Sequence, residues 1–176
     1  MAYIYFPQSD TAISNFNEVD DFFQGAGIIY EQWDITRIPQ ELRDNYLLTD
    51  EQKQVIIEAY TEEIDNLHRQ YGYRSQDLVV LSEHTPNIEL LLTTFKREHH
   101  HVDDEVRFTV DGSGVFTVVG DDQTLIQIVV TPGDLLIVPA KVRHYFELEK
   151  TAGKIKCIRI FKSPAGWDAI FERPPS

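Results

Sequence analysis

The chain has 176 residues, of which 42% are hydrophobic and 26% charged, a balance typical of one folded globular domain. Its formal net charge is −13, and no Lys/Arg cluster interrupts it, which disfavours nucleic-acid and membrane-surface partners. The single cysteine, Cys157, cannot form an intramolecular disulfide and is expected to be a small core residue. With neither a secretory signal nor an apolar run of membrane-spanning length, the sequence predicts a cytoplasmic protein, also nuclear if the source is eukaryotic.

The N-terminal half is expected to be mainly helical, with strands near 27–33 and 78–82. Thr49 and Gln52 have the spacing of a capping box, which predicts a helix start. A second, shorter helix is expected to begin with Pro86 in its first turn. Apolar residues at spacings of three and four predict one helical stripe that faces a core, formed by Ile56, Tyr60, Ile64, Leu67 and Tyr71.

The second half of the chain has the texture of strands. Alternating or continuous apolar runs predict strands at 105–110, 115–119, 125–130, 135–138, 144–148 and 154–161. A turn is expected at 111–114. Short successive strands favour an antiparallel barrel or jelly roll, so the fold class is mostly β with N-terminal helices. We expect a single domain, with a helical part at about 1–95, a barrel core at about 96–162 and a tail at 163–176.

Three consecutive histidines open the most informative segment. Side chains alternate along a strand, so His99 and His101 point the same way while His100 points the other. Glu105 would lie about 13 Å from His101 along a straight strand, too far for both to bind one ion. If the two share an ion, the chain must bend at 102–104.

A further histidine, His144, follows a predicted buried strand and Pro139, and could reach the same place from across the barrel. Three imidazoles and one carboxylate suit Fe(II), Ni(II), Mn(II) or Zn(II), with positions left open for substrate. Structural zinc sites use thiolates, which this group lacks. His68 and His84 have no such pattern and are expected to be ordinary surface or half-buried residues.

These residues resemble the two motifs of the cupin superfamily. The first motif, HxHx3Ex6G, is matched by His99, His101, Glu105 and Gly112. The second, Gx5PxGx2H, is matched by Gly133, Pro139 and His144, with Lys141 where a glycine is usual. The resemblance implies a cupin-type double-stranded β-helix, or jelly-roll barrel.

More narrowly, the chain resembles the acireductone dioxygenase family over most of its length. The similar segments are 43–46, 98–108, 111–114, 137–146, 158–161 and 167–174. The resemblance implies one Fe(2+) or Ni(2+) per chain, held by His99, His101, Glu105 and His144. The partners it implies are a small-molecule acireductone and O2, with no nucleic acid or membrane, and we expect a monomer.

The resemblance further implies a place in methionine salvage and in methionine biosynthesis. The substrate would be 1,2-dihydroxy-5-(methylsulfanyl)pent-1-en-3-one. With iron, enzymes of this type release formate and 4-methylsulfanyl-2-oxobutanoate. With nickel, they release formate, carbon monoxide and 3-methylsulfanylpropanoate.

Two arginines are candidate substrate contacts. Arg107 shares the strand phase of Glu105, so its guanidinium is expected in the same interior, where it needs Glu105 or an anionic substrate oxygen as a partner. A structural ion pair and a catalytic contact to substrate both remain open for Arg107. Arg159 matches a family position near the substrate and has the same two interpretations.

Aromatic and acidic residues complete the candidate site. Phe95, Phe146 and Trp167 match positions that line the family's substrate pocket, although aromatic residues on such strands also serve as plain core. A catalytic base is expected at Asp104 or Glu98, with Asp104 preferred. Either carboxylate could instead orient a ligand histidine.

Two competing functions remain open at this stage. One is another cupin enzyme, either a metal isomerase or a dioxygenase with a different small oxygenated substrate. The other is a non-catalytic cupin whose cavity binds a ligand or partner. The segments around Arg107 and Trp167 favour the acireductone interpretation, because cupins in general do not require them.

Overall fold

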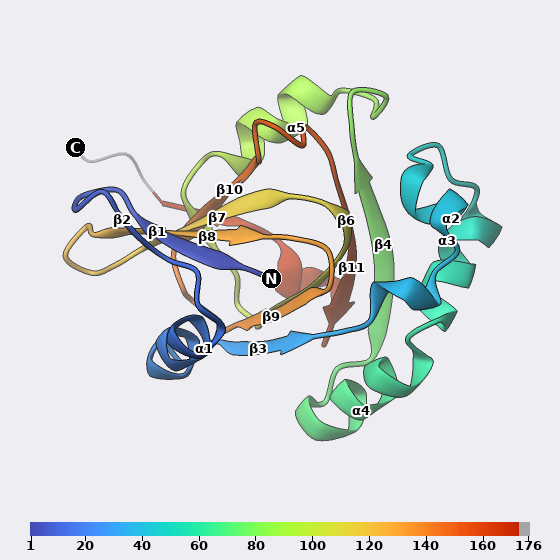
Figure 1. Ribbon diagram of the computed structural model, residues 1–176, viewed down its shortest axis with the longest axis horizontal. Helices are drawn as coiled ribbons and strands as arrows, with labels where there is room; N and C mark the ends of the chain where they lie inside the picture. Colours follow the sequence, from blue (N-terminus) through green and yellow to red (C-terminus); the bar gives the residue numbers. More distant parts are fainter. Residues whose placement is uncertain (173–176) are drawn as a thin grey trace.

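Two antiparallel sheets form the centre of the protein in a computed structural model that describes residues 1–172 (Figure 1). The larger sheet has seven strands, in the order β12 (Ile170–Phe171), β5 (His99–His100), β10 (His144–Leu148), β7 (Gly114–Val119), β8 (Leu125–Val130), β1 (Tyr3–Phe6) and β2 (Thr11–Ile13). The fold class predicted from the sequence, mostly β with N-terminal helices, is confirmed.

The smaller sheet lies against the helical layer. Its five strands run in the order β3 (Ile29–Gln32), β9 (Asp134–Val138), β6 (Glu105–Gly112), β11 (Ile155–Phe161) and β4 (Ser75–Leu81). The strands expected at 125–130 and 144–148 have those bounds, whereas β4 begins earlier than the apolar run at residue 78. β4 pairs with β11 along its whole length, so the ladder includes the polar residues 75–77 at the start of the strand.

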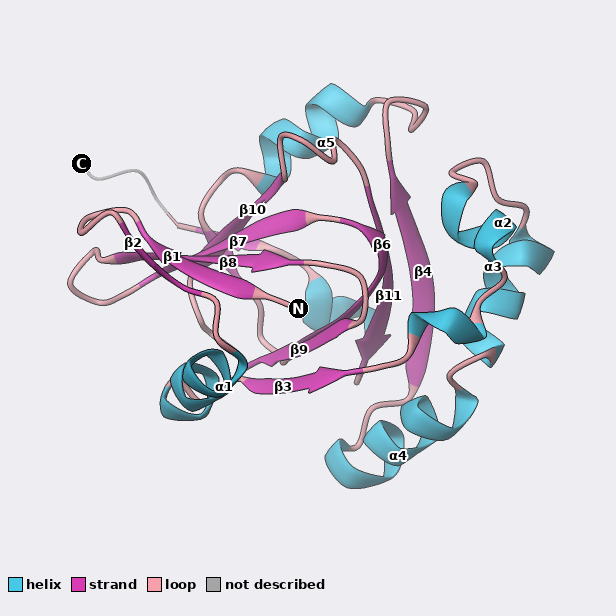
Figure 2. Cartoon of the chain, viewed as in Figure 1, coloured by secondary structure: helices cyan, strands magenta, loops and turns pink. Residues whose placement is uncertain are grey.

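Helices surround the sheets on several sides (Figure 2). In chain order they are α1 (Phe16–Gly25), the 3-10 turn η1 (Ile35–Arg37), α2 (Gln40–Asp44), α3 (Asp50–Glu58), α4 (Thr61–Tyr71), α5 (Ile88–Phe95) and the 3-10 turn η2 (Pro164–Trp167). Helices α2, α3 and α4 lie beyond β4 at the right of the view, and α5 crosses the top. No helix within residues 1–172 is long and apolar enough to cross a membrane.

The capping box predicted from the sequence is present at the start of α3. The amide of Gln52 donates to Thr49 Oγ1 at 3.2 Å, and the amide of Thr49 donates to Gln52 Oε1 at 3.0 Å. The single helical stripe was wrong, because α3 ends at Glu58 and α4 begins at Thr61. Tyr60, between them, is fully buried, and its hydroxyl donates to the carbonyl of Asp34 at 2.9 Å.

One further boundary differs from the sequence prediction. Helix α5 begins at Ile88, and Pro86 lies outside it, because Asn87 adopts the left-handed conformation with φ of 57°. The turn expected at 111–114 is present, and it is a corner between the two sheets, to which β6 and β7 belong separately. Gly112 allows this corner: its φ is 75°, and a Cβ there would lie 2.1 Å from the carbonyl oxygen of Lys154.

Side chains of β6 alternate between two faces, and each face contributes to a different core. Val106, Phe108 and Val110 pack beneath α2, α3 and α4 in one apolar cluster. Glu105 and Arg107 point the other way, into the space between the sheets. A second cluster fills that space with residues of both sheets, among them Phe116, Ile128, Leu136, Phe146 and Cys157. Glu105 and Arg107 are therefore held between the two sheets, as the strand phase predicted.

The division expected near residue 95 does not separate helices from sheets. Strands β1 and β2 extend the larger sheet and β3 and β4 form the edges of the smaller one, although all four precede that position. The expected tail also takes part, since η2 and β12 precede residue 173 and β12 is an edge strand. Residues 173–176, including Arg173 and Pro174 of the resemblance, lie outside the described residues.

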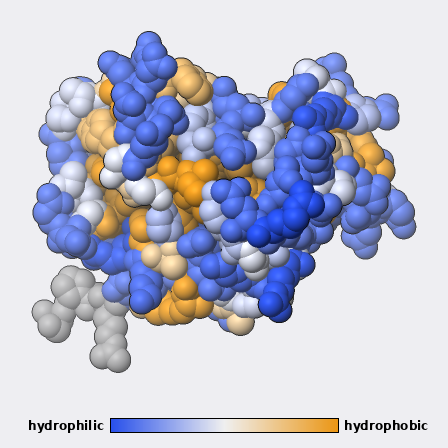
Figure 3. Space-filling view, turned by 90° about the horizontal axis from the view of Figure 1, so that it is seen from below, coloured by the Kyte–Doolittle hydropathy of each residue, from blue (hydrophilic) through white to orange (hydrophobic). Residues whose placement is uncertain are grey.

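Hydrophilic side chains cover most of the face seen from below in Figure 1, and a patch of hydrophobic surface lies near its middle (Figure 3). Helix α1 and strand β3 reach this side of the molecule. Phe16 of α1 is 48% exposed, whereas Val19 and Phe23 on the same helix are fully buried.

Candidate metal centre

Three histidine side chains meet in the space between the two sheets. His99 and His144 are direct partners in the pairing of β5 with β10, and His101 follows β5 immediately. One ring nitrogen from each lies within 4.8 Å of the other two. The residues are only 6%, 6% and 3% exposed for His99, His101 and His144, so the nitrogens face a buried point.

Backbone carbonyls orient all three rings. In each histidine Nδ1 lies against a carbonyl oxygen, which can only accept, so Nδ1 carries the proton and donates it. This leaves Nε2 free to act as a metal ligand. The pairs are His99 with Arg97 (2.6 Å), His101 with Asp168 (3.3 Å) and His144 with Val142 (2.9 Å).

Glu105 brings a carboxylate to the same point from the smaller sheet. The chain bends at Val102 and Asp103, as the ligand spacing required, and β6 then begins at Glu105. Glu105 Oε2 lies 2.9 Å from Nε2 of His144 and 3.9 Å from Nε2 of His101. The four side chains thus span both sheets.

Burial and charge set the protonation of the group in opposite directions. Burial lowers the pKa of His99 to about 4, and it lowers the pKa of His101 as well. Burial opposes ionisation of Glu105, but Arg107 and His144 outweigh it and hold the pKa of that carboxyl well below its usual range. Burial likewise opposes a charge on His144, yet the attraction of Glu105 leaves its pKa raised.

Two polar atoms of the group have no hydrogen-bond partner among residues 1–172. They are His101 Nε2 and Glu105 Oε2, both fully buried, the latter outside hydrogen-bond geometry with its histidine neighbours. An orphaned buried polar atom is costly, by about 1–3 kcal/mol, so native proteins rarely leave one without a purpose. Imidazole nitrogens and a carboxylate oxygen are donors that suit a divalent transition metal. The residues present therefore fit a metal ion.

Arg107 lies beside this group in a box of aromatic rings. Its Nε donates to Glu105 Oε1 at 2.6 Å. Its guanidinium carbon is 5.0, 5.4 and 5.2 Å from the ring centroids of Phe116, Phe146 and Trp167. The ion pair expected from the sequence is present, and the guanidinium retains further donors for another anionic oxygen.

Arg159 and Trp167 form the next layer. Arg159 is the direct partner of Arg107 in the pairing of β11 with β6, and its guanidinium is 5.3 Å from the Trp167 ring. Its Nε and Nη2 donate to the two carboxylate oxygens of Asp77 at 2.8 and 2.5 Å. Trp167 lies 5.7 Å from the His101 ring, and its Nε1 is buried without a hydrogen-bond partner in the described chain. Phe95 is one ring further out, 6.4 Å from Phe146.

Comparison with known proteins shows to which family the chain belongs. A model described as the ARD/ARD′ family matches residues 1–169. Acireductone dioxygenases from Sulfurihydrogenibium sp. and Bacillus subtilis are 47% and 45% identical over 171 and 166 residues, which cover 97% and 94% of this chain and 94% and 93% of those proteins. The chain belongs to the acireductone dioxygenase family.

A solved structure agrees with this assignment. Acireductone dioxygenase from Bacillus anthracis, with a cadmium ion in its active centre, superposes with a TM-score of 0.93 at 42% identity, over 97% of this chain and 98% of that one. The resemblance noted in the sequence is thereby confirmed, and the chain is an enzyme of the dioxygenase class. The three-histidine group and the metal-bound family member together support a metal cofactor.

The two candidate bases accept hydrogen bonds from groups other than the ligand histidines. Asp104 Oδ1 accepts from the amide of Ala140 at 3.1 Å, and Oδ2 accepts from the Tyr73 hydroxyl at 3.0 Å. Glu98 Oε1 accepts from Arg143 at 3.1 Å. Neither carboxylate accepts directly from Nδ1 of a ligand histidine, because backbone carbonyls accept from all three Nδ1 atoms.

Several neighbours of the site escaped the sequence analysis. Asp168 supplies the carbonyl for His101, and the Phe171 ring lies 5.7 Å from that of His99. A backbone carbonyl has no sequence signature, so this contact could not be found. The sequence did offer a signal for Arg143. It precedes the ligand His144, and Glu98, of opposite charge, precedes the ligand His99. His100 faces away, as expected, toward Glu172 at 2.9 Å.

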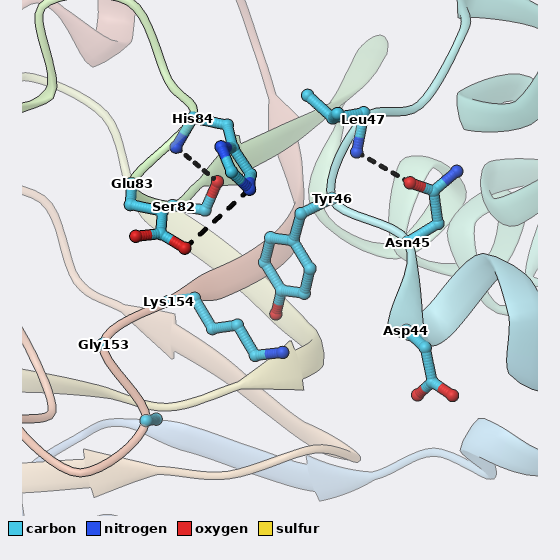
Figure 4. A pocket seen from close by; sticks show the side chains of 10 residues that line it. Asp44, Asn45, Tyr46, Leu47, Ser82, Glu83, His84, Gly153 and Lys154 are labelled. Carbon is cyan, nitrogen blue, oxygen red and sulfur yellow. Dashed lines mark hydrogen bonds and ion pairs between the residues drawn. The ribbon is translucent and has the colours of Figure 1, made fainter.

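A surface cleft of about 480 Å³ lies at the other end of β6 (Figure 4). Tyr46 and Lys154 stand between a wall with His84 and Glu83 and a wall with Asp44. The Tyr46 hydroxyl donates to Asp111 at 2.7 Å, and Asp111 is six residues, or about 20 Å, along β6 from Glu105. None of the predicted metal ligands lines this cleft.

Proposed function

We propose that the chain cleaves 1,2-dihydroxy-5-(methylsulfanyl)pent-1-en-3-one with O2, in methionine salvage, using one Fe(II) or Ni(II) held by His99, His101, Glu105 and His144. The observation that carries the proposal is the convergence of these four side chains at a buried point with two orphaned polar atoms, in a member of the acireductone dioxygenase family. A single chain suffices, since it contains the whole set.

The metal, when bound, supplies a Lewis acid that stabilises the anion of the enediol. Arg107 adds a fixed positive charge beside Glu105, where an anionic substrate oxygen can accept from its remaining donors. Phe146, which is 3% exposed, and Trp167 flank that cation and limit its contact with water, which strengthens its attraction for a substrate anion. Arg159, held by Asp77, and Phe95 extend the same wall for the rest of the substrate.

Removal of the enediol proton needs a base, and we propose Asp104 over Glu98. Support comes from its place directly before Glu105, from its side chain being 28% exposed, and from the engagement of Glu98 in an ion pair with Arg143. The Tyr73 hydroxyl, which donates to its Oδ2, would hold that carboxylate in place. Asp104→Asn should then lower turnover at full metal loading more than Glu98→Gln does.

The products follow from the proposal and balance in atoms. With iron, the substrate and O2 give formate and 4-methylsulfanyl-2-oxobutanoate. With nickel, they give formate, carbon monoxide and 3-methylsulfanylpropanoate. Both oxygen atoms of O2 are accounted for in either set.

The experiment is reconstitution of metal-free protein with Fe(II) or Ni(II) separately, followed by acireductone in an oxygen electrode and identification of products. We expect O2 uptake that depends on metal, with the keto acid from the iron form and carbon monoxide from the nickel form. The exposed His84→Gln variant should behave as wild type, and His144→Ala should lose both metal and uptake. Equal turnover by metal-free protein, or none with either metal, would overturn the proposal.

A further inference from the structure

Strand β5 is too short to define its own position. It contains only His99 and His100. A single residue pair, His99 with His144, joins it to β10, and its other neighbour, β12, is itself only two residues long. Register is weakly determined in such short pairings, and a slip by one residue turns every side chain to the opposite face. Residue type offers no help, because a slip would place another histidine of the 99–101 run opposite His144.

An ion pair crosses this point of the ladder. Glu98 precedes His99, Arg143 precedes His144, and Arg143 Nη1 donates to Glu98 Oε1 at 3.1 Å. The two residues are diagonal neighbours across antiparallel strands, a distance that long side chains can span. In a slipped register Glu98 would point to the other face, and the pair would be lost.

Both partners are anchored to the rest of the larger sheet. Arg143 Nη2 donates to the carbonyl of Gly120 at 2.8 Å, and the Arg143 carbonyl accepts from the amide of Val119 at 2.9 Å, at the end of β7. The Glu98 carbonyl accepts from the amide of Glu172 at 3.2 Å. The charges are 29% and 26% exposed for Glu98 and Arg143, so solvent screens them only in part.

We propose that Glu98 and Arg143 are positioning residues, and that their ion pair holds His99 opposite His144 so that the ligand nitrogens converge. This inference rests on the proposed metal centre. It assigns Glu98 a role other than proton removal, and it adds Arg143 to the residues on which the site depends.

The test measures Co(II) binding to metal-free wild type, Arg143→Met, Glu98→Gln and the double variant. Loss of a residue that orients metal ligands raises the dissociation constant by about 10-fold or more, and we expect this in both single variants. The double variant should be no worse than either single one, because both remove the same pair. The visible spectrum of the Co(II)-saturated protein, which reports the geometry of the ligands, should also change.

A matched control is available in the same segment. Lys96 Nζ lies 2.6 Å from Glu147 Oε1, so this pair also joins the chain before β5 to β10, but further from the ligands. Lys96→Met should leave Co(II) affinity and spectrum unchanged. The thermal midpoint of each metal-free variant should stay within about 4 °C of wild type, since partly exposed ion pairs add little stability. Arg143→Lys, which keeps the charge, should recover part of the affinity.

Two outcomes would overturn the inference alone. One is unchanged Co(II) affinity in Arg143→Met while His144→Ala loses the metal. The other is loss of turnover in metal-saturated Glu98→Gln with full turnover in metal-saturated Arg143→Met, which would make Glu98 the base. Wild-type Co(II) affinity in His144→Ala would instead overturn the proposed metal centre.

Discussion

The paired strands β6 and β11 carry a buried charged residue at each end of their ladder, and the two residues differ in how completely they are hydrogen-bonded. At the end away from the histidines, Lys156 is fully buried, and burial lowers its pKa to about 8, so it still carries a proton at neutral pH. Its Nζ donates to three carbonyls, those of Leu42 and Arg43 at 2.7 Å and of Asn45 at 2.8 Å. All three donors of the ammonium are used, and they satisfy carbonyls at the C-terminal end of α2.

At the other end, Glu105 and the histidines are equally buried but incompletely bonded. His101 Nε2 and Glu105 Oε2 have no hydrogen-bond partner among residues 1–172. A buried charge whose hydrogen bonds are all made contributes to the stability of the fold. Buried polar atoms that converge without hydrogen-bond partners instead indicate a site that binds a ligand. The contrast predicts that changes at the two ends have separate consequences.

The largest effect is expected from Lys156→Met. Methionine fills similar volume but leaves three carbonyls, one in a buried bond and two in partly buried bonds, without the ammonium, so the free energy of unfolding should fall by about 3–5 kcal/mol. Urea denaturation of the metal-free protein measures it. Lys154→Met is the control. Its ammonium lies 4.6 Å from the Tyr46 ring, which Lys156 approaches at 4.4 Å, but Lys154 is exposed and its loss should matter little. Equal, small losses in both variants would contradict a structural role for Lys156.

Glu105→Gln should act in the opposite way, on metal rather than fold. It removes the one anionic ligand of the proposed set, and we expect a dissociation constant about 100-fold higher, or about 2.7 kcal/mol. Isothermal titration with Co(II) measures this. The folded fraction of Lys156→Met should keep wild-type affinity. Comparable weakening by both variants would show that the two ends are not independent.

The pH dependence of metal binding gives a smaller, directional test. His144 has a raised pKa, and below that value its Nε2 holds a proton and cannot bind metal. Affinity should therefore be constant above the raised pKa and fall about tenfold per unit as pH drops below it. A titration series between about pH 5 and 8 measures the slope, which His84→Gln should leave unchanged. A flat profile would mean that His144 does not compete with protons for the ion.

Prediction from the sequence succeeded where local pattern decides the outcome. The strands at 125–130 and 144–148, the capping box of Thr49, and the phase of Arg107 all follow from residue spacing. The bend at Val102 and Asp103 was predicted as well, because Glu105 and His101 can share an ion only if the chain bends between them.

Prediction failed where distant contacts decide. The break between α3 and α4 places the Tyr60 hydroxyl against the carbonyl of Asp34, which is not a neighbour in sequence. The turn at 111–114 was predicted, but that it joins different sheets depends on pairing with distant strands. Strand β12 exists only by pairing with β5, and no periodicity announces a strand of two residues. The carbonyl of Asp168 reaches the site from that same segment.

The smallest effect concerns Lys141, where the cupin motif usually has glycine. The structure supplies the reason, since Lys141 has a φ of 68°, and its amide donates to the carbonyl of His101 at 2.9 Å. Lys141→Gly removes backbone strain of about 1–3 kcal/mol and frees the unfolded chain by only about 0.4–1 kcal/mol, so the unfolding free energy should rise by about 1 kcal/mol. Lys141→Val should lower it, because a β-branched residue tolerates this conformation poorly. Urea denaturation of the two variants distinguishes backbone strain from the effect of losing the lysine side chain. A glycine variant less stable than wild type would show that the lysine side chain itself supports the loop next to His101.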